Sequence, residues 1–199
     1  MSKAILMSIR PKWVAKILNG EKTIEIRKKF PIDYVGWVYI YNTKTTKEGV
    51  LKLAYIGNKL EFVLSYDKTS KYQGKVVARF WCDKVEQVFW HNPRKDEHIP
   101  YLKSCNLLKC ACLCQDEFEE YVGDNESYAI HITNLEIFDK PKEIKEFKRV
   151  KWNKCGVKDK NGLYQCHKCP HAIHYGHGFG DCGYDLPLKA PQSWCYIEV

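Results

Sequence analysis

Short segments with the two-residue alternation or brief apolar run of a β-strand recur along the chain, whereas helical patterns are few. The strand candidates are residues 4–9, 23–27, 36–42, 75–85, 128–132, 134–138 and 194–199. Many short strands with few helices predict an α+β fold built on a small, partly open β-barrel with peripheral helices.

Two segments have helical character. Pro11 suits a first helical turn, where its missing N–H costs nothing, and apolar residues then repeat at helical spacing up to Leu18. Asn19 and Gly20 supply the turn that ends this helix. Residues 115–122 predict a second helix, and 141–147 a helical turn. Residues 44–73 have mixed periodicity and receive no assignment.

Composition narrows the class of protein. With 199 residues, 45% hydrophobic and 14% aromatic, the chain can bury a core, which excludes global disorder. It has no apolar stretch of about 18 residues, so we expect no membrane-spanning helix. The N-terminal apolar run is too short for a signal peptide, and we expect a cytoplasmic protein. A net charge of +8 favours phosphate-bearing partners.

The segment Gly20-Glu-Lys-Thr-Ile-Glu-Ile-Arg27 follows the first helix and enters a strand. Glu25 and Arg27 are two residues apart on that strand, so their side chains face the same way. Lys22 precedes the strand, where the turn can direct its amine to the same place. Two cations and a carboxylate around one pocket suit a phosphate or a polarised carbonyl, although a surface strand with a salt bridge is the simpler interpretation.

The order of motifs resembles the ASCH domain, a family related to the PUA fold. The N-terminal strand, helix and Gly-x-Lys-x-x-Glu-x-Arg segment come first, followed by Val38-Tyr-Ile-Tyr, Gly74-Lys-Val-Val-Ala-Arg-Phe, Glu117-Phe-Glu-Glu-Tyr and Tyr128-Ala-Ile-His-Ile. The C-terminal Pro191-Gln-Ser-Trp-Cys-Tyr-Ile-Glu is similar to the closing strand of phage and prophage members. The resemblance covers roughly residues 3–43, 73–147 and 190–199.

This resemblance implies a β-barrel with a cleft, RNA or nucleotide binding, and catalysis in some small members. One branch is an acetylcytidine amidohydrolase that uses a lysine, a threonine and a separate glutamate. Lys22 matches that lysine, but Glu25 stands where the threonine is expected, so no hydroxyl is available there as a nucleophile. As a hydrolase or ribonuclease, the chain would use Lys22 as a base and Glu25 to orient water.

Other binding candidates lie along the predicted barrel. They are Ser8, Lys12, Tyr41, Gln192 and Trp194. Tyr41 or Trp194 can stack on a base, although most aromatic residues in such a chain belong to the core. With Lys22, Glu25 and Arg27, we take Ser8, Tyr41 and Trp194 as the predicted binding set.

Residues 149–188 are rich in Cys, His, Gly and Lys and poor in aliphatic residues, so they need a staple in place of a core. We interpret them as an insertion in a domain formed by residues 1–148 and 189–199. The expected staple is one structural Zn²⁺ held by Cys155, Cys166, Cys169 and Cys182. A histidine in place of one thiolate and a redox pair at Cys166 and Cys169 remain alternatives. A protein-interaction module with this insertion as its docking surface is a third functional hypothesis.

The sequence has two further features, the remaining cysteines and a basic run between positions 140 and 154. Cys110, Cys112 and Cys114 are badly spaced for one metal ion, and we expect Cys112 and Cys114 to be buried thiols. Cys82 and Cys195 are expected inside strands. Seven basic residues between positions 140 and 154 suit either a nucleic-acid track or a solvated linker.

Overall fold

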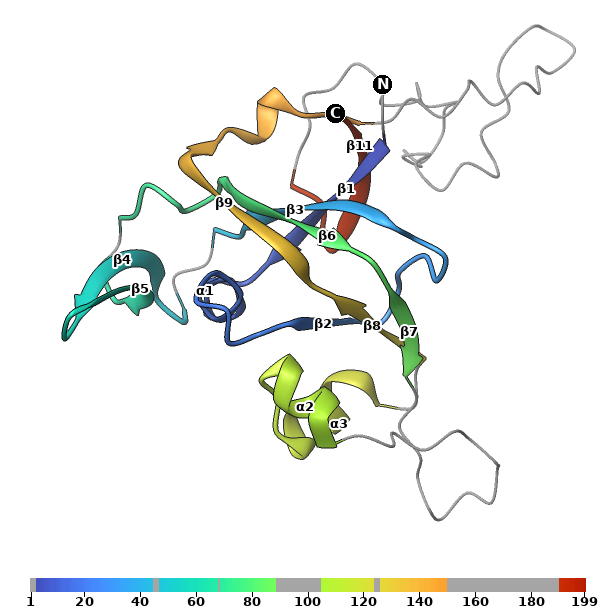
Figure 1. The fold of residues 1–199 in the computed structure, drawn as a ribbon. Helices are drawn as coiled ribbons and strands as arrows, with labels where there is room; N and C mark the ends of the chain where they lie inside the picture. The colour runs from blue at the N-terminus through green and yellow to red at the C-terminus, as the bar shows by residue number, and fades with distance from the viewer. Residues whose placement is uncertain (1–2, 45–46, 68, 89–104, 124–125, 150–189) are drawn as a thin grey trace, which may run out of the picture.

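The protein has an α+β architecture of three separate sheets and few helices in a computed structural model that describes residues 3–44, 47–67, 69–88, 105–123, 126–149 and 190–199 (Figure 1). The strands are β1 (Lys3–Ile9), β2 (Ile24–Arg27), β3 (Gly36–Asn42), β4 (Val50–Ile56), β5 (Lys59–Ser65), β6 (Val76–Cys82), β7 (Val85–Val88), β8 (Ser127–His131), β9 (Thr133–Lys142), β10 (Lys148–Arg149) and β11 (Trp194–Glu198). The helices are α1 (Pro11–Leu18), α2 (Cys105–Ala111), α3 (Gln115–Val122) and the 3₁₀ turn η1 (Ile144–Glu146).

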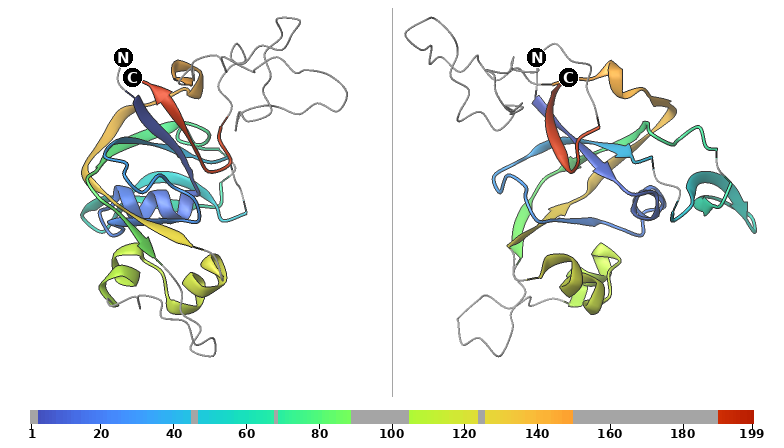
Figure 2. Two further views of the ribbon diagram at one scale, coloured as in Figure 1. Left: turned by 90° about the vertical axis from the view of Figure 1, so that its right-hand side faces the viewer. Right: turned by 180° about the vertical axis from the view of Figure 1, so that it is seen from behind.

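The largest sheet has six strands in the order β10-β11-β1-β3-β6-β9. Strands β1 and β3 run parallel because α1 crosses between them, and the other neighbours are antiparallel. The C-terminal β11 pairs with the N-terminal β1, with Lys3 opposite Glu198. Figure 2 shows these two strands side by side near the marked chain ends.

A second sheet has the order β2-β8-β7 and lies between the main core and two helices. Ile130 of β8 turns to the main core, whereas Ala129 turns to α2 and α3, as the two-residue period of a strand requires. Figure 1 shows these helices against β2 and β8. The sheet is therefore covered on both faces, which suits the apolar residues on both sides of β8.

The largest sheet also has two apolar faces. One packs against α1 through alternate residues such as Val38, Ile40 and Phe80, together with Val14 and Ile17 of the helix. The opposite face forms a smaller core that includes Tyr39, Tyr41, Val76 and Phe147.

The structure confirms the predicted α+β class, but the described strands show no closed barrel. None of the three sheets closes on itself in the part of the chain that the structure describes. The structure differs from the prediction at the strand expected over residues 75–85, because Asp83 and Lys84 interrupt it. Its first part, β6, joins the largest sheet, and its second part, β7, pairs with β8. Alternation predicted strands but not which sheet each strand would join.

The structure confirms α1, α3 and β3 at their expected bounds. The helical turn expected at residues 141–147 is confirmed only as η1, because Pro141 and Lys142 extend β9. The unassigned region 44–73 contains a hairpin of β4 and β5 that lies beside α1 (Figure 1). None of the described helices is long and apolar enough to cross a membrane.

Candidate functional site

The turn after α1 places Lys22. Gly20 takes a positive φ of 76°, which ends the helix at little cost for a residue without Cβ. The backbone N–H groups of Glu21 and Lys22 then both donate to the carbonyl of Lys16, at 2.9 and 3.0 Å. This tight return directs the chain into β2 and leaves the Lys22 side chain inside the molecule.

Lys22 is a buried cation, with only 3% of the residue exposed. Its Nζ donates to the carbonyl oxygen of Ala111 in α2 at 2.6 Å and lies 3.4 Å from Glu25 Oε2. The same ammonium lies 5.0 Å from the centre of the Trp13 ring. Burial lowers the pKa of Lys22 below its ordinary value, although the charge of Glu25 and its hydrogen bond oppose that shift.

Glu25 joins Lys22 to Arg27. Its other oxygen, Oε1, lies 3.1 Å from Arg27 Nε, and Glu25 itself is 6% exposed. The guanidinium is anchored by Nη2, which donates to the carbonyl of Ser8 at 2.7 Å. The Nε–H is not aimed well enough at Glu25 to form a directed hydrogen bond. Two cations and one carboxylate leave this cluster, defined as Lys22, Glu25 and Arg27, with one net positive charge.

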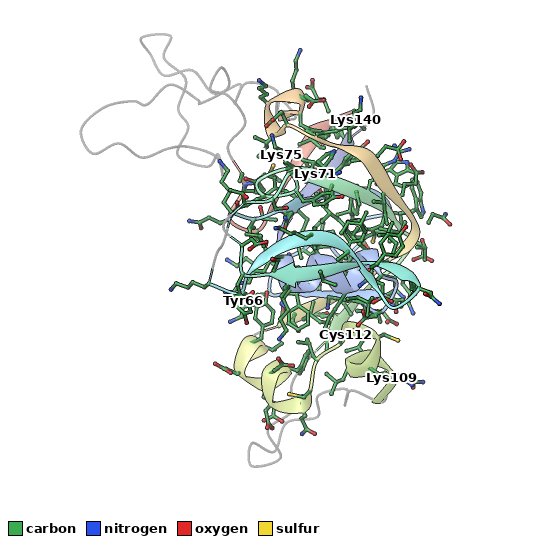
Figure 3. All side chains as sticks on the ribbon, turned by 90° about the vertical axis from the view of Figure 1, so that its left-hand side faces the viewer. Tyr66, Lys71, Lys75, Lys109, Cys112 and Lys140 are labelled. Carbon is green, nitrogen blue, oxygen red and sulfur yellow. The ribbon has the colours of Figure 1, made fainter. Side chains whose placement is uncertain are left out.

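The end of α2 is fastened to the turn that carries Lys22. Three consecutive residues of the helix end each contact it, through the carbonyls of Cys110 and Ala111 and the thiol of Cys112. The Thr23 N–H donates to Cys110 at 2.9 Å, and Cys112 Sγ donates to the Glu21 carbonyl at 3.3 Å. Figure 3 labels Cys112 beside Lys109 at this end of the molecule. The position of the buried amine therefore depends on α2.

Aromatic rings and further cations surround the cluster. Tyr121 of α3 is 40% exposed, and the charges of Arg27 and Glu25 both act on its hydroxyl. Burial of the hydroxyl raises the pKa of Tyr121. Lys28 Nζ lies 5.4 Å from the Tyr121 ring, and Lys12 Nζ lies 4.4 Å from the half-buried Trp13 ring. These groups form the more accessible border of the site.

The sequence predicted the cluster itself but not its border. The sequence marked Trp13 only as an apolar position of a helix. It marked Tyr121 only as a residue of an expected helix, with no indication of a role in binding. Lys12, one of the other binding candidates, pairs with Glu117 of α3 at 3.1 Å. Gln192 is exposed in the segment that precedes β11. No local pattern relates residue 121 to residue 27, because only the tertiary fold brings α3 to β2.

The structure brings Ser8 to the cluster, but through its carbonyl. The Ser8 hydroxyl instead donates to the carbonyl of Pro191 at 2.6 Å. Tyr41 is paired with Ser8 in register, but its side chain belongs to the smaller core on the face away from α1. Burial raises the pKa of Tyr41. These placements separate the Tyr41 ring from Lys22 and Glu25.

Trp194 packs against the main core, on the face of the largest sheet that also contacts α1. Its ring contacts Phe30 and Tyr196 at centroid distances of 5.6 and 5.5 Å, and its Nε1 donates to the carbonyl of Lys29 at 2.6 Å. Within the described residues, the ring contacts and the hydrogen bond of Trp194 reach none of Lys22, Glu25 and Arg27. Its structural neighbours are core aromatics and the segment that follows β2.

The four predicted zinc ligands, Cys155, Cys166, Cys169 and Cys182, lie outside the described residues. Within those residues, no group of three His, Cys, Asp or Glu side chains is placed to hold a metal ion. Cys82 and Cys195 are buried, as predicted. The expected burial of Cys112 and Cys114 is wrong, because Cys112 is half-buried and Cys114 is an exposed N-cap of α3.

Comparison with known proteins adds three solved structures. No protein-family profile and no curated protein matches the sequence. An ASCH protein from Zymomonas mobilis aligns with 16% identity and a TM-score of 0.43 over 71% of this chain and 73% of its own. A tyrosine-to-phenylalanine variant of it aligns at 15% identity, TM-score 0.44, and 72% and 77% coverage. A serine-to-alanine variant aligns at 16% identity with a TM-score of 0.44, over 72% of this chain and 78% of its own. All three TM-scores lie below 0.5, so ASCH membership stays a prediction from sequence.

Proposed function

We propose that the chain is an ASCH-type protein that binds RNA or a nucleotide at the cluster of Lys22, Glu25 and Arg27. The observation that carries this proposal is the meeting of a buried cation, Lys22, and a partly buried one, Arg27, on the two oxygens of one carboxylate. Such a cluster keeps a net positive charge in surroundings where charge is poorly screened. It is therefore suited to hold an anionic group or a polar base edge.

The border of the site supports a nucleotide over a simple anion. Trp13 and Tyr121 offer aromatic surface beside the cluster, and Lys12 and Lys28 place amines over those rings. An unpaired base stacks on such rings, while amines and guanidinium groups contact phosphate oxygens. The Arg27 side chain keeps 12% of its surface exposed, so its guanidinium can contact an oxygen of the guest.

Fluorescence anisotropy with a labelled single-stranded RNA tests this function. We expect the affinity to fall steeply as salt increases, because neutralised phosphates release counterions. Arg27→Gln should weaken binding by about tenfold or more, since a charge-assisted hydrogen bond is lost from a buried site. Lys109→Gln is the matched control, because it removes an exposed positive charge from α2. Equal affinities of Arg27→Gln and the wild type would refute the proposal.

A second candidate function is hydrolysis of RNA or of a modified nucleoside. It is favoured by one observation, the burial that lowers the pKa of Lys22 and so makes its amine easier to deprotonate. A deprotonated Lys22 would take a proton from water, and Glu25 would orient that water. Lys22→Gln should then abolish turnover while the protein still folds. Turnover that survives this substitution in a folded protein would exclude Lys22 as the base.

The insertion at residues 149–188 is proposed to hold one structural Zn²⁺ through Cys155, Cys166, Cys169 and Cys182. Thiolates with a Cys-x-x-Cys pair suit tetrahedral zinc, and the segment has few aliphatic residues from which to build a core. Its role would be to fold the insertion. A phage or prophage origin and a cytoplasmic location belong to the same proposal and rest on the sequence alone.

A further inference from the structure

The face of the largest sheet that is turned away from α1 carries aromatic rings and a planar cation in adjacent positions. Trp37 of β3 and Trp81 of β6 are directly opposite each other, with ring centroids 5.4 Å apart at 83°. The next cross-strand pair on this face is Tyr39 and Arg79, and the Arg79 guanidinium lies 4.0 Å from the centre of the Trp37 ring. We refer to Trp37, Arg79 and Trp81 as the sheet platform.

Arg79 is held in place by side chains on both neighbouring strands. Its Nε and Nη2 lie 2.8 and 2.7 Å from the same oxygen of Glu136 on β9, and Nη1 donates to the Tyr39 hydroxyl at 3.3 Å. The Arg79 side chain nevertheless remains 31% exposed. A guanidinium fixed over an indole in this way loses little rotational freedom when a ligand stacks on it.

Further cations lie on the same side of the sheet. Phe138 of β9 packs into the smaller core on this face, and Lys142 Nζ lies 4.7 Å from its ring. Lys142 is opposite Val76, the first residue of β6, and Lys75, which precedes that strand, is ion-paired with Glu143. From Val76 to Trp81, β6 advances by five residue-to-residue steps, or roughly 16 Å. Figure 3 labels Lys75 and Lys140 at this end of the molecule.

We propose that this face binds single-stranded RNA at a second surface, distinct from the cluster of Lys22, Glu25 and Arg27. Unpaired bases stack on aromatic rings and on guanidinium planes, whereas phosphates pair with amines beside them. The sheet platform provides the first kind of contact, and Lys142 provides the second. A purely acidic partner would use the amines but would have no use for a guanidinium stacked on an indole.

The two surfaces lie on different sides of the largest sheet. Trp13, which contacts Lys22, is on α1, and α1 packs on the face opposite to the sheet platform. Substitutions at one surface therefore leave the other intact. If Arg27→Gln has no effect while Arg79→Lys weakens binding, the proposed function at the cluster fails and this inference stands.

The test uses the full chain with a fluorescein-labelled 15-nucleotide single-stranded RNA of mixed sequence and with the same sequence as a duplex. Arg79→Lys keeps the charge but removes the planar group, so the single strand should bind at least about fivefold more weakly. Affinity for the duplex, whose bases are not free to stack, should change less than twofold. Lys142→Gln should lower the affinity for both ligands. The exposed-lysine control Lys109→Gln should lower neither affinity by more than twofold.

A second variant keeps the test decisive if Arg79→Lys unfolds the sheet, which thermal unfolding will detect. Trp37→Phe retains an aromatic core contact but reduces the stacking surface, and should also weaken single-strand binding selectively. Wild-type affinity in both folded variants would overturn the inference. An undetectable affinity of the wild type for the RNA would also overturn it. So would an Arg79→Lys variant that binds the single strand and the duplex with equally reduced affinity, or polyglutamate that displaces the labelled RNA as well as unlabelled RNA does.

Discussion

The ammonium of Lys22 donates to the carbonyl oxygen of Ala111 at 2.6 Å, which ties the turn after α1 to the end of α2. That carbonyl is one of the last in its helix, where no intrahelical N–H is available to it. A positive charge at a helix end is also favoured by the helix dipole. This hydrogen bond gives a partner to the Lys22 ammonium and to the Ala111 carbonyl, each of which would cost free energy if buried without one. It also fixes the amine beside Glu25.

Stability should depend on pH through Lys22. Burial lowers the pKa of Lys22 in the folded chain below the ordinary value of 10.5 that it has when unfolded. Between these two values the unfolded chain binds more protons, so this group makes the protein more stable as pH rises through that window. The free energy of unfolding in urea, measured from pH 7.5 to 10, should therefore rise relative to Lys22→Met.

The comparison with Lys22→Met removes the effect of other groups that titrate in the same range. Cys82 is one such group, since burial raises its pKa to about 11 and thus contributes the opposite dependence. A difference between wild type and Lys22→Met that stays constant, or falls as pH rises, would contradict the assignment of a lowered pKa to Lys22.

Asn19 should stabilise the hairpin that the sequence did not predict. Its side chain exchanges two hydrogen bonds with the backbone of Phe62 in β5, each 2.9 Å long. Asn19→Ala should lower the free energy of unfolding by about 1–3 kcal/mol, because the Phe62 backbone loses both partners. Gln115→Ala, at an exposed position of α3, should change it by less than about 0.5 kcal/mol. Equal effects of the two substitutions would refute this role.

The cysteines of the folded chain should react in a fixed order. Cys114 is exposed, whereas Cys82 is buried and its pKa is raised to about 11. Iodoacetamide at pH 8, followed by peptide mass spectrometry, should therefore modify Cys114 well before Cys82. In urea the two rates should become similar. Modification of Cys82 as rapid as that of Cys114 under native conditions would contradict the packing of β6.

Native mass spectrometry of the full chain should find one zinc ion per chain. The double substitution of Cys166 and Cys169 by serine should abolish the bound metal, because it removes half of the proposed thiolate ligands. Cys114→Ser is the matched control and should retain it. A metal-free wild type, or full zinc content in the double variant, would refute the proposed site.

The elements near the chain start were predictable because their signals are local. Pro11, the helical spacing that follows it and Gly20 define α1, and alternation places Glu25 and Arg27 on one side of β2. The spacing of Lys22 was enough to predict that its amine would reach the same place, which the 3.4 Å distance to Glu25 confirms.

Long-range pairing was not predictable in the same way. The break at Asp83 transfers the chain from one sheet to another, and nothing local distinguishes this from a bulge within one strand. The border residue Tyr121 reaches the cluster only because α3 packs under β2. Trp37 and Trp81 each had the pattern of a strand residue, and only the register makes them neighbours.

An NMR titration of the ¹⁵N-labelled chain with single-stranded RNA tests the central claim most directly. The side-chain signals of Arg27 Nε–H and the Trp13 indole N–H, assigned with Arg27→Gln and Trp13→Phe, report on the cluster itself. We expect both to shift in proportion to bound RNA. RNA binding that leaves the Arg27 and Trp13 signals unmoved would contradict the account.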